Sequence, residues 1–208
     1  MIEQPRPPAP DPQVVDYLAE QIAGNAALTS RFAPLRADLP TAALAQTHPR
    51  AGVTISNLPG TLVSGRQSFC AIYLSAGMVI STITVCSGTT AAGTPTAQWF
   101  SLYDANRNKL AVTADDTTTA WGSNSYKTLT LSSPYTVPTS GIYYIGVMVA
   151  ASTVPTMAGF LASTLVINLP PILCGADTTN TGLTTPATAP ATAATLTGSS
   201  NYFYAYVA

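Results

Sequence analysis

From about residue 65 to its end, the chain is a succession of short β-forming runs separated by turn signals, with no helical repeat among them. Many short strands without intervening long helices indicate antiparallel sheets packed on one another. The sequence therefore predicts a mainly β fold, an antiparallel β-sandwich that is jelly-roll-like. The expected strands are Gln67–Ser75, Met78–Cys86, Thr96–Tyr103, Lys109–Ala114, Tyr126–Leu131, Gly141–Ala151, Thr164–Leu169 and Asn201–Val207.

Hydrophobic periodicity supports these strands. Threonine alternates with Ile, Val or Leu over residues 82–85 and 128–131, which is typical of strands with one buried face. Large apolar and aromatic side chains in the longer runs are the expected core. These are Trp99, Phe100, Leu102, Ile142, Tyr144 and Val147.

The first 35 residues have a different pattern. Residues 1–10 form a Pro-rich arm of extended character, and Asp11-Pro12 is a good helix start, with Asp as N-cap and Pro at the first position. Because so short a helix is marginal alone in water, its apolar stripe must dock, either on its own domain or, as we favour, on a partner. The stripe of this predicted helical anchor consists of Val14, Val15, Leu18 and Ile22.

Two further segments complete the expected organisation. Residues 36–60, which contain three prolines, are interpreted as a linker to a β-sandwich domain over residues 61–208. Within that domain, residues 177–200 are a low-complexity Thr/Ala/Pro-rich loop, unusually long for a compact domain.

The chain closes on an aromatic run in which Tyr202, Tyr204 and Tyr206 would share one face of a strand and Phe203 the other. One interpretation is a final sheet strand with Phe203 inward. The other is an exposed row of tyrosines that contacts sugars or a protein partner.

Charge excludes several classes of protein. Only 8% of the residues are charged and the net charge is −1, so no positive field is available to hold nucleic acid or an anionic membrane surface. The longest apolar run, residues 141–151, is too short to span a bilayer as a helix.

The charged residues are distributed unevenly along the chain. Nine charged residues lie in the first fifty, and Asp177 is the one charged residue after Lys127. Either the neutral, hydroxyl-rich domain is soluble by itself, or much of its surface meets other subunits.

No strong catalytic or metal-binding pattern is present. His48 lies next to a proline without a nearby acidic residue, and a hydrolase triad built on it is not expected. The three cysteines, Cys70, Cys86 and Cys174, have no metal-ligand spacing and are expected to be buried, reduced thiols. Without a secretory leader in the N-terminal residues, folding in a reducing cytosol is expected.

Acidic residues near residue 110 are the remaining candidates. Asp104 with Asp115 or Asp116 could pair as two carboxylates, but a hairpin turn and a solvated loop explain them as well. Asp104, Asn106 and Asn108 have the spacing that starts a calcium loop, but the glycine and the bidentate glutamate of that loop are missing. We therefore expect no enzyme activity, no cofactor and no metal.

A resemblance to a known group adds a function. A short N-terminal helical anchor, a Pro-studded linker and a Thr/Ala-rich β domain resemble the small virion proteins of tailed bacteriophages that infect actinobacteria. The likeness covers about residues 65–208. The Tyr135–Tyr144 run also resembles carbohydrate-binding jelly rolls, in which its Gly-aromatic part is a core strand. The motifs that carry it are Trp99–Asp104, Thr119–Trp121, Pro134–Val147 and the Tyr-rich end.

The resemblance implies a non-enzymatic structural or adhesive role in a virion, often as a trimer. We expect residues 1–35 to dock on other virion proteins and the β domain to be displayed outward, in a minor tail protein that adsorbs to host-surface glycans. A capsid decoration protein is the first alternative and a free carbohydrate-binding module the second. The expected location is the virion, after synthesis in the host cytoplasm, with no nucleic acid bound and no membrane insertion.

Overall fold

The computed structural model describes residues 38–117, 119–193 and 195–208. The chain divides into two compact units, Met1–Asp38 and Leu39–Ala208. The predicted helical anchor, with Val14, Val15, Leu18 and Ile22, lies outside the described residues. Two short 3-10 helices, η1 (Arg50–Gly52) and η2 (Pro186–Thr188), accompany the strands of the second unit. The strands are β1 (Ala45–Gln46), β2 (Ile55–Leu58), β3 (Gln67–Leu74), β4 (Val79–Cys86), β5 (Gly93–Tyr103), β6 (Lys109–Val112), β7 (Tyr126–Thr136), β8 (Gly141–Thr153), β9 (Met157–Leu161), β10 (Cys174–Asp177), β11 (Leu196–Gly198), β12 (Asn201–Phe203) and β13 (Ala205–Val207).

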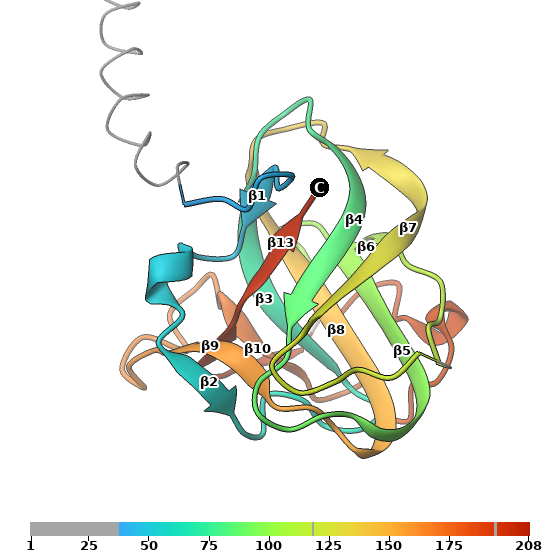
Figure 1. Ribbon diagram of the computed structural model, residues 1–208. Helices are drawn as coiled ribbons and strands as arrows, with labels where there is room; N and C mark the ends of the chain where they lie inside the picture. Colours follow the sequence, from blue (N-terminus) through green and yellow to red (C-terminus); the bar gives the residue numbers. More distant parts are fainter. Residues whose placement is uncertain (1–37, 118, 194) are drawn as a thin grey trace, which may run out of the picture. The chain divides into compact units, whose positions relative to one another are not determined.

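The strands form three antiparallel sheets that pack together, which confirms the mainly β prediction. A four-stranded sheet has the order β1-β13-β4-β7, a six-stranded sheet the order β11-β10-β3-β8-β5-β6, and a three-stranded sheet the order β12-β9-β2. In Figure 1, β4 and β7 lie in front of β8 and β5, and the main hydrophobic core fills the space between these two layers. None of the helices in the described part of the chain is long and apolar enough to cross a membrane.

Both faces of the six-stranded sheet are buried. On its central strand β8, Ile145 and Val147 belong to the main core, whereas Tyr144 and Met148 point to the opposite face and join two smaller apolar clusters there. Side chains alternate across a strand, so a strand that is covered on both sides needs apolar residues at every position. Of the predicted core residues, Ile142 is only partly buried, and those that are fully buried are Trp99, Phe100, Leu102, Tyr144 and Val147.

The outer face of the six-stranded sheet is covered by residues 178–193, here called the strap. Its apolar side chains pack on large ones of the sheet: Leu183 and Ala189 lie in the cluster of Trp99, and Ala193 lies in the cluster of Tyr103. The Thr/Ala/Pro composition thus serves a segment that lies flat on an aromatic surface. Figure 1 draws this segment in orange to red, behind β8 and β5.

Side-chain donors from β5, from β6 and from the turn between them hold the strap through its backbone carbonyls. Four such hydrogen bonds run from Trp99 Nε1 to Thr184 O (3.1 Å), from the Tyr103 hydroxyl to Pro190 O (2.8 Å), from Lys109 Nζ to Ala189 O (2.8 Å) and from Arg107 Nε to Ala193 O (2.8 Å). A segment with few large side chains is therefore anchored by its main chain.

Residues 36–60, expected as a linker, contain two strands of the sheets. β1 pairs with β13 and β2 pairs with β9, so residues 45–46 and 55–58 belong to two of the sheets. These strands are short, and their partners lie about 100 residues away for β2 and about 160 for β1. The local hydrophobic pattern of the sequence therefore could not predict these two strands.

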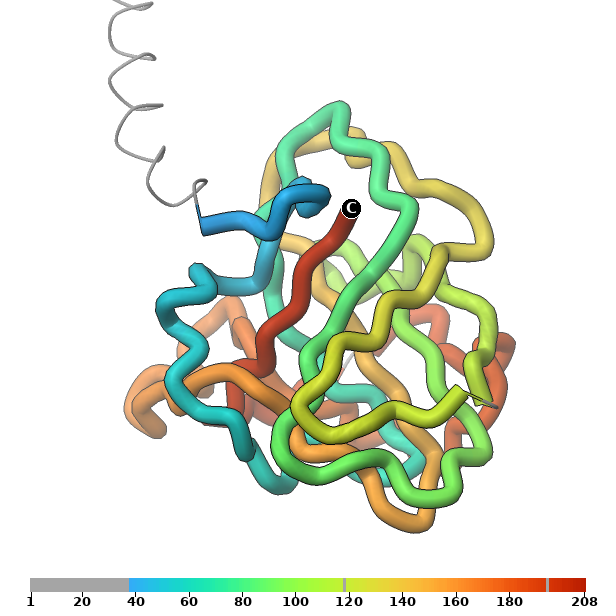
Figure 2. The backbone as a smooth tube through the Cα atoms, in the orientation of Figure 1, coloured from blue at the N-terminus to red at the C-terminus, as the bar shows by residue number. Residues whose placement is uncertain are grey.

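Two predicted strands also differ from the structure. Residues 164–168 form turns, and the strand of this region, β9, precedes them. The expected strand Asn201–Val207 is divided, because Tyr204 sits where the chain leaves the three-stranded sheet (β12) for the four-stranded one (β13). The tube in Figure 2 follows this last stretch, in dark red, to the C-terminus.

Candidate functional site

Aromatic rings from several elements form a row that includes the three predicted tyrosines. Tyr202 stacks on Phe160 at a centroid distance of 4.9 Å, and Phe160 meets the edge of His48 at 4.8 Å. His48 contacts Tyr204 at 5.5 Å, and Tyr204 contacts Tyr206 at 6.3 Å. The tyrosines are thus linked through His48 and Phe160 and do not form one flat ladder.

Burial separates the members of this row. Tyr204 is only 3% exposed, and its hydroxyl donates to Gln46 Oε1 at 3.0 Å, because the strand break turns this ring toward β1. Tyr202 and Tyr206 are half-buried and keep part of their surface in solvent. Of the three tyrosines expected as surface contacts, the structure leaves Tyr202 and Tyr206 as candidates.

His48 packs as an aromatic ring between Phe160 and Tyr204. Burial lowers the pKa of its imidazole to about 4, and its Nδ1 lies 3.2 Å from Thr47 Oγ1. Its Nε2 is buried without a hydrogen-bond partner in the described part of the chain. A neutral imidazole held in this way contributes packing.

The acidic residues named in the sequence are each held in structural hydrogen bonds. Asp104 accepts from the backbone N–H and the side-chain amide of Asn108 at 2.8 and 3.0 Å, which closes the β5–β6 hairpin. Asp115 accepts from Gln98 N at 2.8 Å and from the Thr117 hydroxyl at 2.6 Å. In the ranges that the structure describes, no three His, Cys, Asp or Glu residues gather closely enough to hold a metal ion.

Asp116 forms an ion pair with a buried lysine. Lys127 Nζ lies 2.6 Å from Asp116 Oδ2 and donates to Thr119 O at 3.0 Å. Burial by itself raises the pKa of the Asp116 carboxyl, but hydrogen bonds from Lys127 and Thr119 and the Lys127 charge outweigh it and leave the pKa below its ordinary value. The pair connects β7 to the loop after β6 and is structural.

A pocket of about 210 Å³ lies where β10, β11 and β12 meet the segment before β3. Its lining residues are mostly small and mixed in character: glycines and hydroxyl residues, the Asn201 amide, and the apolar Val63, Ala176 and Phe203, with Arg66 as the one charged lining residue. Arg66 Nε donates to Asp177 O at 3.1 Å, and this is the one bond that the guanidinium makes within the described residues. Its remaining N–H groups are therefore available to a ligand. Other polar side chains of the lining are Thr61, Ser68, Thr178, Thr197 and Ser199.

The sequence did not predict this pocket, because its lining comes from three separate segments, residues 60–68, 174–178 and 197–203. One signal was present in the sequence: Arg66 is the one charged side chain between Arg50 and Asp104. In a chain with so few charged residues, an isolated arginine indicates a candidate binding position.

An apolar loop, residues 161–173, lies next to the pocket. Five of the ten exposed large hydrophobic residues in the described ranges belong to it, and Leu165 and Leu169 are 87% and 60% exposed. The loop is fastened by a hydrogen bond from Ala162 N to Ser200 O (2.8 Å), and Ile167 O crosses so close over the pocket residue Gly198 that a Cβ there would clash. The exposed apolar side chains of the described domain are therefore concentrated in this loop.

Comparison with known proteins identified no relative. No family model, no curated protein and no solved structure matches the chain.

Proposed function

We propose that this chain is a non-enzymatic structural protein of a tailed-bacteriophage virion, a minor tail protein whose β domain adsorbs to host-surface glycans. In this proposal residues 1–35 dock the protein to the particle through the stripe of Val14, Val15, Leu18 and Ile22. The displayed β domain is jelly-roll-like and the assembly is trimeric. The observation that carries the adsorption function is the pocket around Arg66.

The size and chemistry of the pocket suit one sugar unit. Its volume of about 210 Å³ is below the roughly 300–1,000 Å³ of sites for drug-sized ligands, so it favours a small polar ligand. Its hydroxyl groups and the Asn201 amide can exchange hydrogen bonds with sugar hydroxyls. The free guanidinium N–H groups of Arg66 are suited to a carboxylate or phosphate. We therefore infer a glycan unit that carries one acidic group.

The distribution of charge supports a displayed domain. Nine charged residues lie in the first fifty, and the one charged residue after Lys127 is Asp177, which is buried. A nearly neutral surface does not repel neighbouring copies, as a repeated component of a large assembly requires.

A glycan array with the full chain tests the adsorption function. We expect binding to glycans with uronic acid or phosphate groups, at least tenfold weaker binding for Arg66→Gln, and unchanged binding for Arg50→Gln, which removes an equal charge from η1 outside the pocket. Gln can still donate to Asp177 O, so the fold is expected to persist. Equal glycan binding by the unmodified chain and the Arg66→Gln variant, or no binding to any glycan, would contradict the adsorption function.

The apolar loop favours the second candidate, a capsid decoration protein that covers neighbouring head subunits. Deleting residues 1–35 should abolish incorporation into particles under either candidate, and normal incorporation would place the anchor elsewhere. Replacing Leu165 and Leu169 by Ser should weaken incorporation of a decoration protein while leaving the domain folded.

Immunogold labelling of particles, on the head or on the tail, separates the two candidates. A protein absent from purified particles would leave the free carbohydrate-binding module.

A further inference from the structure

Cys70 and Cys174 face each other across two neighbouring strands of the six-stranded sheet. Their Cα atoms are register partners in the antiparallel pair of β3 and β10. The backbone bond from Ala71 N to Leu173 O (2.7 Å) identifies the two cysteines as a non-hydrogen-bonded pair, the type in which opposite side chains lie closer. Such pairs have Cα atoms about 4.5 Å apart, within the range of roughly 4.4–6.8 Å that disulfides span.

The two side chains also share the same surroundings. Directly opposite residues point to the same face of a sheet, and both cysteines belong to the main hydrophobic core. Both are free thiols in the structure, and each is almost fully buried. Cys174 lies close enough to Cys70 to raise the pKa of its thiol. The two thiols therefore face each other at short range across the strand pair.

We propose that Cys70 and Cys174 are a redox pair that closes into a cross-strand disulfide when a small-molecule disulfide reaches them through the pocket.

Access from solvent is through Cys174. Cys174 lines the pocket, where its thiol donates to Asn201 O at 3.0 Å, whereas Cys70 does not line it. Burial raises the pKa of the Cys70 thiol, and the neighbouring Cys174 raises it further. Cys174 is therefore the first nucleophile, and Cys70 acts second.

The reaction is a thiol–disulfide exchange in two steps. The Cys174 thiolate attacks a small disulfide RS–SR, forms a mixed disulfide and releases RS⁻, which takes up a proton. Cys70 then gives its proton to solvent, attacks Cys174 Sγ and releases the second RS⁻. In total two protein thiols are oxidised to one disulfide, and RS–SR is reduced to two RSH.

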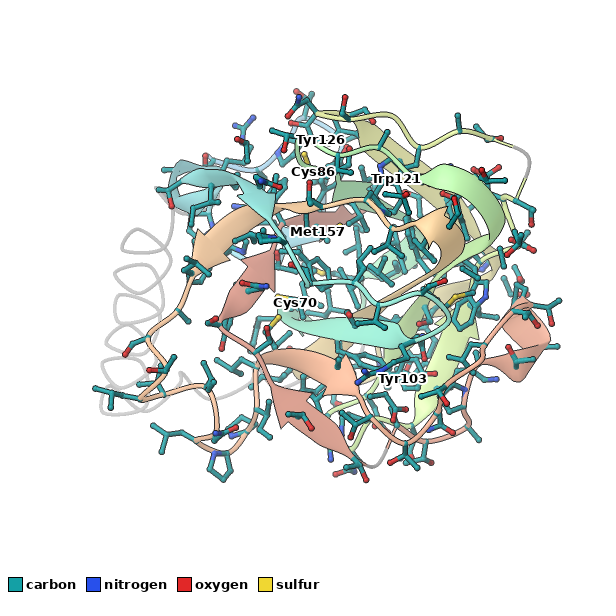
Figure 3. All side chains as sticks on the ribbon, turned by 90° about the horizontal axis from the view of Figure 1, so that it is seen from below. Cys70, Cys86, Tyr103, Trp121, Tyr126 and Met157 are labelled. Atoms are coloured by element: carbon teal, nitrogen blue, oxygen red, sulfur yellow. The ribbon has the colours of Figure 1, made fainter. Side chains whose placement is uncertain are left out.

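Cys86 provides an internal comparison. It lies on β4, in the four-stranded sheet, where its register partner is Tyr126. Figure 3 shows Cys86 beside Tyr126 and well away from Cys70. Burial raises the pKa of its thiol, and no cysteine faces it. If simple exposure governed oxidation, the half-buried Cys86 would react first.

The experiment uses the full chain as the Cys86→Ser variant, purified reduced and incubated under native conditions with 2-hydroxyethyl disulfide. We expect the loss of two thiols per chain, a mass lower by two hydrogens, one Cys70–Cys174 peptide in a non-reducing digest, and a melting temperature raised by about 5 °C. Oxidised glutathione, which is too large for the pocket, should react at least tenfold more slowly.

Two outcomes would overturn the inference. One is the persistence of both thiols in the native protein with cross-linking only in denaturant, and the other is cross-linking between chains in place of within them. The Cys70→Ala variant tests the order of attack, because it should stop at a mixed disulfide on Cys174. A protein that binds no glycan but forms this disulfide would refute the proposed adsorption function and leave this inference intact.

Discussion

Removing the carboxylate of Asp116 should destabilise the β domain strongly, because the lysine that it neutralises is buried. Lys127 is 5% exposed at its side chain, whereas Asp116 is 26% exposed. Deleting one partner of a buried pair costs roughly 3–5 kcal/mol, since the remaining charge is left without a counter-charge. Asp116 is partly solvated, so we take the lower end and expect Asp116→Asn to cost about 3 kcal/mol.

The reciprocal substitution should cost less. Lys127→Met keeps an apolar chain of similar length inside the domain and leaves Asp116, which solvent can reach. We expect a loss of about 1 kcal/mol, and a similar value for the double variant, in which no charge remains. This asymmetry follows from burial alone, because both single variants remove the same ion pair.

Urea denaturation of the full chain at neutral pH, with thermal melting as a second measurement, tests this prediction. A loss of about 3 kcal/mol corresponds to a melting temperature lower by about 6–12 °C for a domain of this size. The pKa of the Asp116 carboxyl is lowered in the fold, so its contribution is present above the unfolded pKa and is lost as pH falls through the folded pKa. Equal costs for the two single variants, or a double variant that loses their sum, would refute the reasoning.

Two further predictions concern His48 and the strap. Because burial lowers the pKa of His48 from 6.5 to about 4, the unfolded chain binds the proton first, so the free energy of unfolding should fall as pH drops from 6.5 to 4. This part of the pH dependence should be missing in His48→Phe, and an identical slope in both proteins would contradict it. Tyr103→Phe removes the hydroxyl bound to Pro190 O and should cost about 1 kcal/mol and speed hydrogen exchange in the strap. Unchanged exchange there would show that the strap is held without this bond.

Much of the candidate site was beyond the reach of sequence analysis. The terminal tyrosines were recognised by composition, but whether each ring is exposed depends on the turn at Tyr204, where the chain changes sheets. Arg66 and Cys174 come together in one pocket although more than 100 residues separate them in the chain. Cys70 and Cys174 likewise face each other because β10 adds to the edge of β3, and the spacing of the cysteines in the sequence does not encode this register.

The sequence alone determined the fold class and the longest strands of the domain. These strands are long enough to show an alternating or continuous apolar pattern in the sequence; they are β3, β4, β5, β7 and β8. The tertiary structure decided the short strands, such as β1 with two residues, whose pairing is stabilised by a distant partner and not by their own side chains. It also decided the role of the Thr/Ala/Pro segment. Small side chains allow a segment to lie close to another surface, but they do not specify which surface. The aromatic face that the strap covers exists only after the six-stranded sheet has formed.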